Sequence, residues 1–269
     1  MKIIKHSAEI IDPDGHTIHN VRKHIERCAR TCYKSEGNIT DSSSTVFVNA
    51  LIKNGHTAML EHGTIYLTVP IPNYELSPEC LAILPQLIVN PYSQYTKTPN
   101  YFYITTNYRV IKEHGWEDIF EFIDSPTLSH PQRITVKIIC DRGILAEFTR
   151  HRVFSFAAES TRYCNYSKTK FGNEITCIEQ EGISNDDLQE TLKVCEEAYN
   201  SLIDRGHKPE NARAVLPMAL KTEVIMTGFL TQWQSFFDLR LNGTTGKPHP
   251  NAKKIAETIH RQFRQRGLI

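Results

Sequence analysis

Residues 133–163 read RITVKIICDRGILAEFTRHRVFSFAAESTRY. From Arg133 to Cys140, apolar residues alternate with polar ones, which predicts a strand with one buried face. The Asp141-Arg142-Gly143 sequence then predicts a tight turn, and the residues from Gly143 to Ser155 are expected to form a helix. This order of strand, turn and helix places the polar residues that follow at the edge of a sheet.

The segment from Arg150 to Tyr163 contains three arginines, one histidine, two serines and one carboxylate. Guanidinium groups match phosphate geometry with paired hydrogen bonds, so three arginines suit a ligand with more than one phosphate. In a helix, Arg150 and Arg152 would diverge by about 200° and serve different partners. His151 lies between these two cations and is expected to stay neutral. The alternative is a solvated basic face, but such a face would not need the apolar bulk at 154–158.

Global composition describes an ordinary globular chain of 269 residues, 40% hydrophobic and 23% charged, with a formal net charge of +1. It is long enough to bury a large core, and we expect one domain over 1–269. A balance of 31 basic and 30 acidic residues argues against a nucleic-acid binder. No apolar run approaches membrane-spanning length and no signal-peptide core is evident, so we expect no membrane partner and a cytoplasmic location. Seven cysteines without a Cys-x-x-Cys pair favour reduced thiols.

Turn and periodicity signals predict the remaining elements. Residues 1–20 are expected to form a hairpin, or a strand followed by the turn at 12–15. Further patterns predict helices at 21–35, 42–55, 78–84 (stopped by Pro85), 116–123, 184–206, from 209, 232–241 and 251–263, strands at 64–69 and 101–105, and loops at 90–99 and 165–172. Together they predict an α+β fold: a mixed, largely antiparallel sheet flanked by helices, with a helical C-terminal half.

The segment from His56 to His62 holds two histidines and Glu61 within seven residues. These are metal-ligand types, but the order differs from the His-Glu-x-x-His of zinc peptidases and no third ligand is evident nearby. We therefore expect no metal site here. Two structural histidines are the alternative to a functional role.

The sequence Arg150-His151-Arg152, followed after seven residues by Ser160 and then by Arg162-Tyr163, resembles the signature of the flavin-dependent thymidylate synthases (ThyX family). Partial matches extend from about residue 20 to about residue 262. They include ARTCY at 29–33, the Gly-His segment at 55–62, an arginine before Val-Leu-Pro at 213–217, and FFDLR at 236–240.

The resemblance implies reductive methylation of dUMP to dTMP. FAD would be the redox relay, NADPH the electron source and 5,10-methylenetetrahydrofolate the one-carbon donor, in a homotetramer whose subunits share active sites. The resemblance assigns cofactor binding to His56, Arg150, His151, Arg152 and Glu159, and substrate binding to Glu147, Arg150, Ser160, Thr161, Arg162, Arg213 and Arg240. Arg240 is the candidate catalytic residue, because a permanent cation beside the uracil would stabilise negative charge. Glu147 could instead pair with Arg150.

Some positions depart from the family pattern. Phe229 and Thr231 stand where the family often has an asparagine and an arginine for the flavin's adenine and phosphates, and Ser235 stands where an asparagine or histidine is common. The glutamate of the motif, Glu159, lies one place later than usual. Residues 70–131 form an insertion relative to the family, whose expected role is an added layer or an oligomer contact.

Two other functions remain open on the residues alone. A nucleotide phosphohydrolase would need a carboxylate-rich metal site, and Glu61, Glu159 and Asp238 are widely separated in sequence. A non-catalytic nucleotide- or nucleic-acid-binding protein could use the arginine segment, and its DNA affinity would fall steeply with salt.

Overall fold

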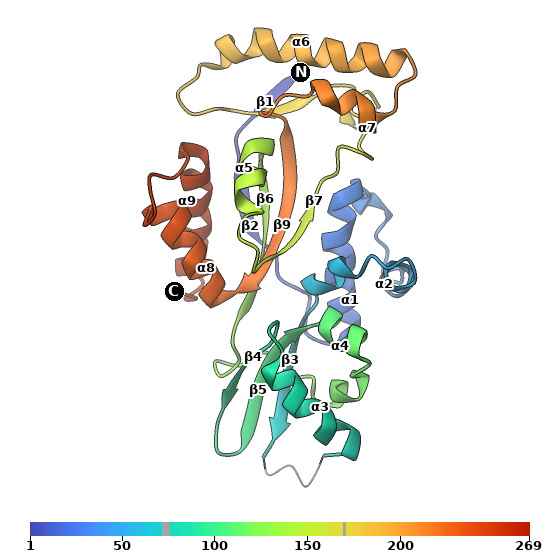
Figure 1. Cartoon of the computed structure of the whole chain (residues 1–269), viewed down its shortest axis with the longest axis vertical. Helices are drawn as coiled ribbons and strands as arrows, with labels where there is room; N and C mark the ends of the chain where they lie inside the picture. The colour runs from blue at the N-terminus through green and yellow to red at the C-terminus, as the bar shows by residue number, and fades with distance from the viewer. Residues whose placement is uncertain (72–75, 169–170) are drawn as a thin grey trace.

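The computed structural model describes residues 1–71, 76–168 and 171–269. Figure 1 shows an elongated molecule whose elements follow in this order: β1 (Lys2–Ile4), β2 (Ser7–Ile10), α1 (Ile18–Arg30), η1 (Thr31–Tyr33), η2 (Glu36–Asn38), α2 (Ser43–Lys53), η3 (Thr57–His62), β3 (Thr64–Pro70), α3 (Pro78–Val89), β4 (Gln94–Lys97), β5 (Tyr101–Asn107), α4 (Tyr108–His114), η5 (Glu117–Phe122), β6 (Arg133–Asp141), α5 (Arg142–Phe148), β7 (Ser155–Ala158), β8 (Thr176–Ile178), α6 (Asn185–Asp204), α7 (Pro209–Ala212), η7 (Arg213–Val215), β9 (Lys221–Phe229), α8 (Leu230–Phe237), η8 (Asp238–Asn242) and α9 (Pro250–Gln265).

The central sheet has the strand order β2-β6-β9-β7, and all of its pairs are antiparallel. Successive side chains of β9 point to opposite faces. Val224 and Met226 pack with α5, α8 and α9, whereas Ile225 packs with Cys28 of α1. Helices therefore cover both faces of the middle of this sheet (Figure 1).

A second sheet, β3-β5-β4, lies at one end of the molecule (Figure 1). Together with α1, α2, α3 and α4 it encloses a separate apolar cluster that includes Leu67, Leu87, Ile104 and Ile111. Apart from β3, this sheet is built from the segment that the sequence marks as an insertion. Residues 72–75 of that segment lie outside the described residues.

At the opposite end, β1 pairs in parallel with β8, and α6 and α7 pack nearby (Figure 1). The α6 helix begins at Ser184, whose side chain accepts a hydrogen bond from the Asp187 amide. Its apolar stripe contributes Leu192 and Tyr199 to a third buried cluster.

The predicted α+β class, with antiparallel sheets flanked by helices, is confirmed. The strands expected at 64–69 and 101–105 are present as β3 and β5. The seven cysteines form no disulfide with one another. None of the described helices combines the length and the apolar character needed to cross a bilayer.

Several local predictions are wrong. Residues 1–20 form no hairpin, because β1 pairs with β8 and β2 pairs with β6, but the alternative of a strand followed by a turn fits β2 and the irregular segment after it. The helix expected over 143–155 ends at Phe148, so the helical divergence of Arg150 and Arg152 does not apply. The segment at 116–123 is a 3-10 turn, and β4 lies inside the expected loop at 90–99.

The α3 helix continues through Pro85 to Val89 rather than stopping before the proline. A proline inside a helix removes one backbone hydrogen bond and costs about 3 kcal/mol. Here Leu84 and Leu87, on either side of Pro85, are buried in the apolar cluster around the β3-β5-β4 sheet. Burial of these side chains offsets the loss.

Candidate active site

Arg240 lies where α8 gives way to a π-helical turn, η8, a geometry that recurs at functional sites. Its Nε donates a hydrogen bond to His151 Nε2 at 2.9 Å. Its Nη1 donates to Glu147 Oε2 at 2.8 Å, and its Nη2 donates to the Glu147 carbonyl at 2.9 Å. The fold thus joins three predicted site residues, although Glu147 and Arg240 are 93 positions apart.

Aromatic packing holds the segment after α5 against α8. The Phe148 and His151 rings each lie 5.1 Å from the Phe236 ring, and Phe154 lies 4.7 Å from Trp233. These rings explain the apolar bulk in the arginine segment, because they form the core that fixes the turn bearing His151. The predicted pair of Glu147 with Arg150 is wrong, since Arg240 takes the carboxylate.

His151 is neutral, as predicted, but for a different reason. Burial, together with the neighbouring Arg240, lowers the pKa of His151 to about 4. Because Arg240 Nε donates to His151 Nε2, the imidazole proton is assigned to Nδ1. Arg150 and Arg152 are exposed on the turn beside it.

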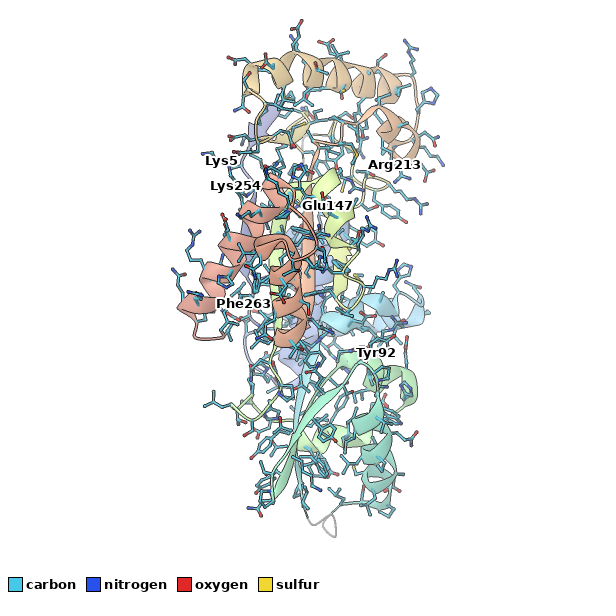
Figure 2. The ribbon with its side chains drawn as sticks, turned by 60° about the vertical axis from the view of Figure 1, so that its left-hand side comes forward. Lys5, Tyr92, Glu147, Arg213, Lys254 and Phe263 are labelled. Carbon is cyan, nitrogen blue, oxygen red and sulfur yellow. The ribbon has the colours of Figure 1, made fainter. Side chains whose placement is uncertain are left out.

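A second group of predicted residues gathers on the loop after β7. Thr161 Oγ1 accepts a hydrogen bond from Arg213 Nη1 at 3.3 Å, and Arg162 Nη2 lies 3.4 Å from a Glu210 oxygen. The Ser160 amide donates to the Cys32 carbonyl at 3.0 Å. The loop is therefore attached both to η7 and to η1, the turn that follows α1. Figure 2 shows Glu147 near the middle of the molecule and Arg213 closer to the end that carries α6.

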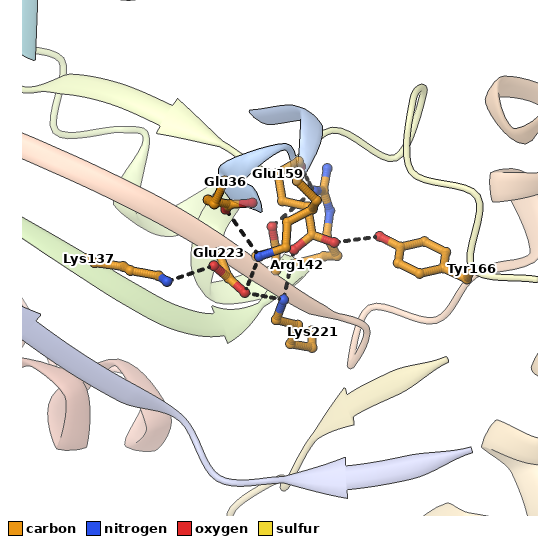
Figure 3. A network of polar contacts seen from close by, with 9 residues as sticks. Glu36, Lys137, Arg142, Glu159, Tyr166, Lys221 and Glu223 are labelled. Atoms are coloured by element: carbon orange, nitrogen blue, oxygen red, sulfur yellow. Dashed lines mark hydrogen bonds and ion pairs between the residues drawn. The ribbon is translucent and has the colours of Figure 1, made fainter. Parts of the chain in front are cut away.

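Glu159 belongs to a buried network of charges (Figure 3). One of its carboxylate oxygens lies 2.9 Å from Lys221 Nζ, and the other accepts a hydrogen bond from the Tyr166 hydroxyl at 3.1 Å. With the side chain almost fully buried, both oxygens are satisfied within the protein. The predicted contact between Glu159 and the cofactor would require this network to open.

Lys221 links Glu159 to Glu223, whose carboxylate also pairs with Lys34 at 2.6 Å and with Lys137 at 3.1 Å. Burial alone would lower the pKa of Lys221, but the two glutamates outweigh it and raise the pKa. Burial would raise the pKa of Glu223, yet Lys221 and Lys34 bring it to about 2. Lys221 and Glu223 therefore stay ionised at neutral pH. Their ion pairs tie the loop after β7 to the end of η1.

His56 is exposed and lines a cavity of about 420 Å³. Its walls are largely apolar, with a few polar groups, and are formed by Ala29, Cys32, Tyr33, Leu51, Gly55, His56, Thr57, Ala58, Met59 and Arg109. The volume and the mostly apolar lining of this cavity fit a small-molecule site. Glu61 and His62 have protein partners instead: Glu61 pairs with Arg109 at 2.6 Å, and His62 Nδ1 lies 2.8 Å from Thr227 Oγ1.

The three departures from the family pattern have local roles. Phe229 is buried at the start of α8, with the Arg133 guanidinium 5.9 Å from its ring. The Ser235 hydroxyl donates to the Thr231 carbonyl one helical turn earlier.

A cavity of about 640 Å³ beside Asp12 and Arg27 is lined by none of the predicted site residues.

Sequence reasoning missed Lys221, Glu223 and Arg109. Lys221 and Glu223 are two positions apart and therefore share one face of β9, but that strand was not predicted. Arg109 lies in α4, within the insertion, where no motif marks it. The largely β-branched and apolar run from Thr222 to Thr227 was the available signal for β9.

The family model described as thymidylate synthase complementing protein (Thy1) matches residues 102–266. The chain belongs to this family. The ThyX resemblance seen in the sequence is thereby confirmed, and the match begins inside the segment expected to be an insertion.

Several relatives are named flavin-dependent thymidylate synthases. The Synechocystis enzyme is 29% identical over 217 residues, which cover 72% of this chain and 91% of the relative. The Pyrococcus furiosus enzyme is 36% identical over 107 residues, 38% of this chain and 43% of the relative. A probable member from Paramecium bursaria Chlorella virus 1 is 28% identical over 140 residues, 47% of this chain and 65% of the relative.

Among solved structures, the chain is similar to the UMP/dUMP methylase PolB from Streptomyces cacaoi bound with 5-Br dUMP. The TM-score is 0.45 at 16% identity, with 98% of this chain and 93% of that chain covered. At this score the likeness does not establish a shared fold.

Proposed function

We propose that this chain is a flavin-dependent thymidylate synthase that methylates dUMP to dTMP. The observation that carries the proposal is the joining of Arg240, Glu147 and His151 in a chain of the Thy1 family. Each is a residue that the family resemblance assigns to the nucleotide or the flavin. Their contact joins two segments that are remote in sequence, residues 147–151 and the turn bearing Arg240.

Arg240 has the chemistry that this role needs. Each of its three guanidinium nitrogens donates one N–H, two of them to Glu147 and one to His151. Each terminal nitrogen therefore has a second N–H for another acceptor. The guanidinium keeps its charge throughout the physiological pH range. Held in a fixed orientation, it would stabilise negative charge that develops on a uracil ring.

Ser160, Thr161, Arg162 and Arg213 are proposed to grip the nucleotide. Arg162 and Arg213 are exposed, and Arg213 is oriented by its hydrogen bond to Thr161. Arg150 and Arg152, on the turn before β7, supply further exposed guanidinium groups for phosphate. Ser160 is not proposed as a nucleophile, because its Oγ accepts a hydrogen bond from the Arg162 amide and no base among the described residues hydrogen-bonds to it.

The cavity lined by His56 is proposed to hold the flavin ring. When bound, FAD would supply the redox chemistry, with NADPH as electron source and 5,10-methylenetetrahydrofolate as one-carbon donor. The protein's own task is to orient these molecules against the pyrimidine. A homotetramer with shared sites and a cytoplasmic location complete the proposal.

A visible absorption spectrum tests the binding part. Purified protein is incubated with FAD, freed of unbound flavin and titrated with dUMP. We expect a retained band near about 450 nm, the usual position for oxidised flavin, that shifts when dUMP is added. Formation of dTMP from dUMP, methylenetetrahydrofolate and NADPH then tests turnover. Absence of both retained flavin and a dUMP response would refute the proposal and favour a nucleotide phosphohydrolase.

A further inference from the structure

The described residues of the segment 70–131 are called the extra lobe, and residues 56–62 are called the His56 loop. The extra lobe contacts the His56 loop through α4. Sheet register places the start of β3 opposite the end of β5, because Thr64 pairs with Asn107. The η3 turn therefore ends, and α4 begins, at the same edge of the sheet. The Asn107 side chain caps α4 by accepting from the Val110 amide, and the Tyr108 amide donates to the Gly63 carbonyl at 2.8 Å.

Two side chains of α4 hold both ends of η3. Arg109 Nη1 donates to Glu61 Oε1 at 2.6 Å, near the end of the turn. Arg109 Nε donates to Glu113 Oε1 at 2.8 Å, and the same oxygen accepts from the Thr57 hydroxyl at 2.8 Å, near the start of the turn. Arg109 and Glu113 together thus span the turn from Thr57 to Glu61.

Arg109 also lies between two cavities. It lines the cavity of about 420 Å³ that contains His56, and a second of about 350 Å³ beside Tyr92. Its side chain is 35% exposed, so an isolated pair at this position would contribute little. Arg109 makes one charge-assisted hydrogen bond to each of two carboxylates, Glu61 and Glu113, and two contacts from one planar guanidinium restrict its orientation more than a single contact does.

We propose that Arg109 is a positioning residue through which the extra lobe fixes the His56 loop, and with it one wall of the flavin site. The flavin part rests on the proposed function, whereas the clamping of the loop does not. The lobe thereby gains a role in cofactor binding besides adding a layer to the fold.

A neighbouring ion pair provides a matched control. Lys112 also lies on α4 and pairs with Glu117, which belongs to the same lobe. Its loss removes a charge and an ion pair of similar exposure but leaves the contacts to η3 intact. Arg109→Met and Lys112→Met therefore separate clamping of the loop from general stability of the lobe.

Hydrogen exchange in the full chain without ligand gives the first readout. We expect amides in residues 57–63 to exchange about tenfold faster in Arg109→Met, the scale of losing partly exposed charge-assisted hydrogen bonds, and to be unchanged in Lys112→Met. Titration with FAD gives the second readout. The dissociation constant should rise about tenfold in Arg109→Met and by less than about twofold in Lys112→Met.

Exchange in Arg109→Met equal to that of the wild type would overturn the proposal, as would equal effects in the two variants. If the wild type itself fails to bind FAD, the proposed function fails, but the exchange comparison still decides whether Arg109 clamps the loop. Should Arg109→Met not fold, Thr57→Val removes only the contact to Glu113. Unchanged exchange at residues 57–60 in that variant would also contradict the clamp.

Discussion

Arg240 has its hydrogen bonds arranged before any substrate arrives. Glu147 accepts two of them and His151 the third, so the guanidinium pays little reorganisation on binding. Glu147 and His151 also hold the Arg240 guanidinium in one orientation, so that it does not swing out into solvent. Arg240 is therefore the position at which a single substitution should separate catalysis from flavin binding.

Replacing Arg240 by alanine should leave flavin bound and lower dTMP turnover by about two orders of magnitude or more, the scale of one lost oriented charge. Arg240→Lys is the matched control, because lysine keeps the charge but lacks the planar fork that contacts both the carboxylate and the backbone carbonyl of Glu147. It should recover only part of the rate. Steady-state dTMP formation at saturating dUMP is the measurement, and near-normal turnover in the alanine variant would exclude the catalytic role.

Two buried histidines make the fold sensitive to acid. Burial lowers the pKa of His24 to about 4 and that of His62 to about 3. Both stay neutral in the folded chain at pH 5, whereas in the unfolded chain they take up protons below their ordinary pKa of 6.5. Their contribution to stability is thus complete above pH 6.5 and declines as the pH falls towards their folded pKa values.

Thermal unfolding measured at pH 7 and pH 5 tests this. Protonation of each histidine in the unfolded chain should lower the unfolding free energy by about 2 kcal/mol between pH 7 and pH 5. Tm should therefore fall by several degrees. His24→Gln can keep the contact to Thr135 without titrating, so its Tm should depend less on pH. A pH dependence in His24→Gln as steep as that of the wild type would argue against this account.

At the scale of elements, the loop after β7 is held by charges carried on β9. Lys221 compensates Glu159, whose only other side-chain partner among the described residues is Tyr166. The Glu223 carboxylate forms ion pairs with three lysines, Lys34, Lys137 and Lys221. Removing Lys221 therefore leaves Glu159, rather than Glu223, as the uncompensated buried charge.

Lys221→Met should lower the unfolding free energy by about 3 kcal/mol and weaken dUMP binding, because the loop bearing Ser160 to Arg162 loses its anchor. Adding Glu159→Gln removes the uncompensated charge and keeps the partner for Tyr166, so more than half of the stability should return. Chemical denaturation and dUMP titration of both variants measure this. A double variant that is less stable than the single one would contradict the arrangement of charges.

At the scale of the whole molecule, the candidate residues divide between two supports. Arg240 is held by α5 and the turn after it, whereas Arg213 is held by the loop after β7. A tetramer with shared sites would bring such groups together from different subunits. Complementation between inactive subunits distinguishes that arrangement from a site within one chain.

Arg240→Ala and Arg213→Ala chains, each of low activity alone, are to be unfolded together and refolded. If each site draws these arginines from two subunits, about a quarter of the sites in a random mixture contain both, and activity should rise towards about a quarter of the wild-type value. Each variant refolded alone is the control. Activity that does not rise on mixing would place both arginines in the same subunit's site.

Much of the site was predictable because its signals are local. The Arg150-His151-Arg152 segment, Ser160 and the FFDLR sequence identified the family that the Thy1 match confirms. Alternation from Arg133 to Cys140 predicted β6, and the side chain of Asp141 caps α5 just where a turn was expected. Such features depend on residues within a few positions of one another.

Tertiary structure decided which remote segments meet. The motifs predicted Arg240, Glu147 and His151 as candidate site residues, but only packing of Phe148 against Phe236 shows that they are in contact. Strand pairing and the compensation of a buried charge such as Glu159 depend on residues far away along the chain. Burial is a property of the whole fold, so no local pattern can specify these contacts.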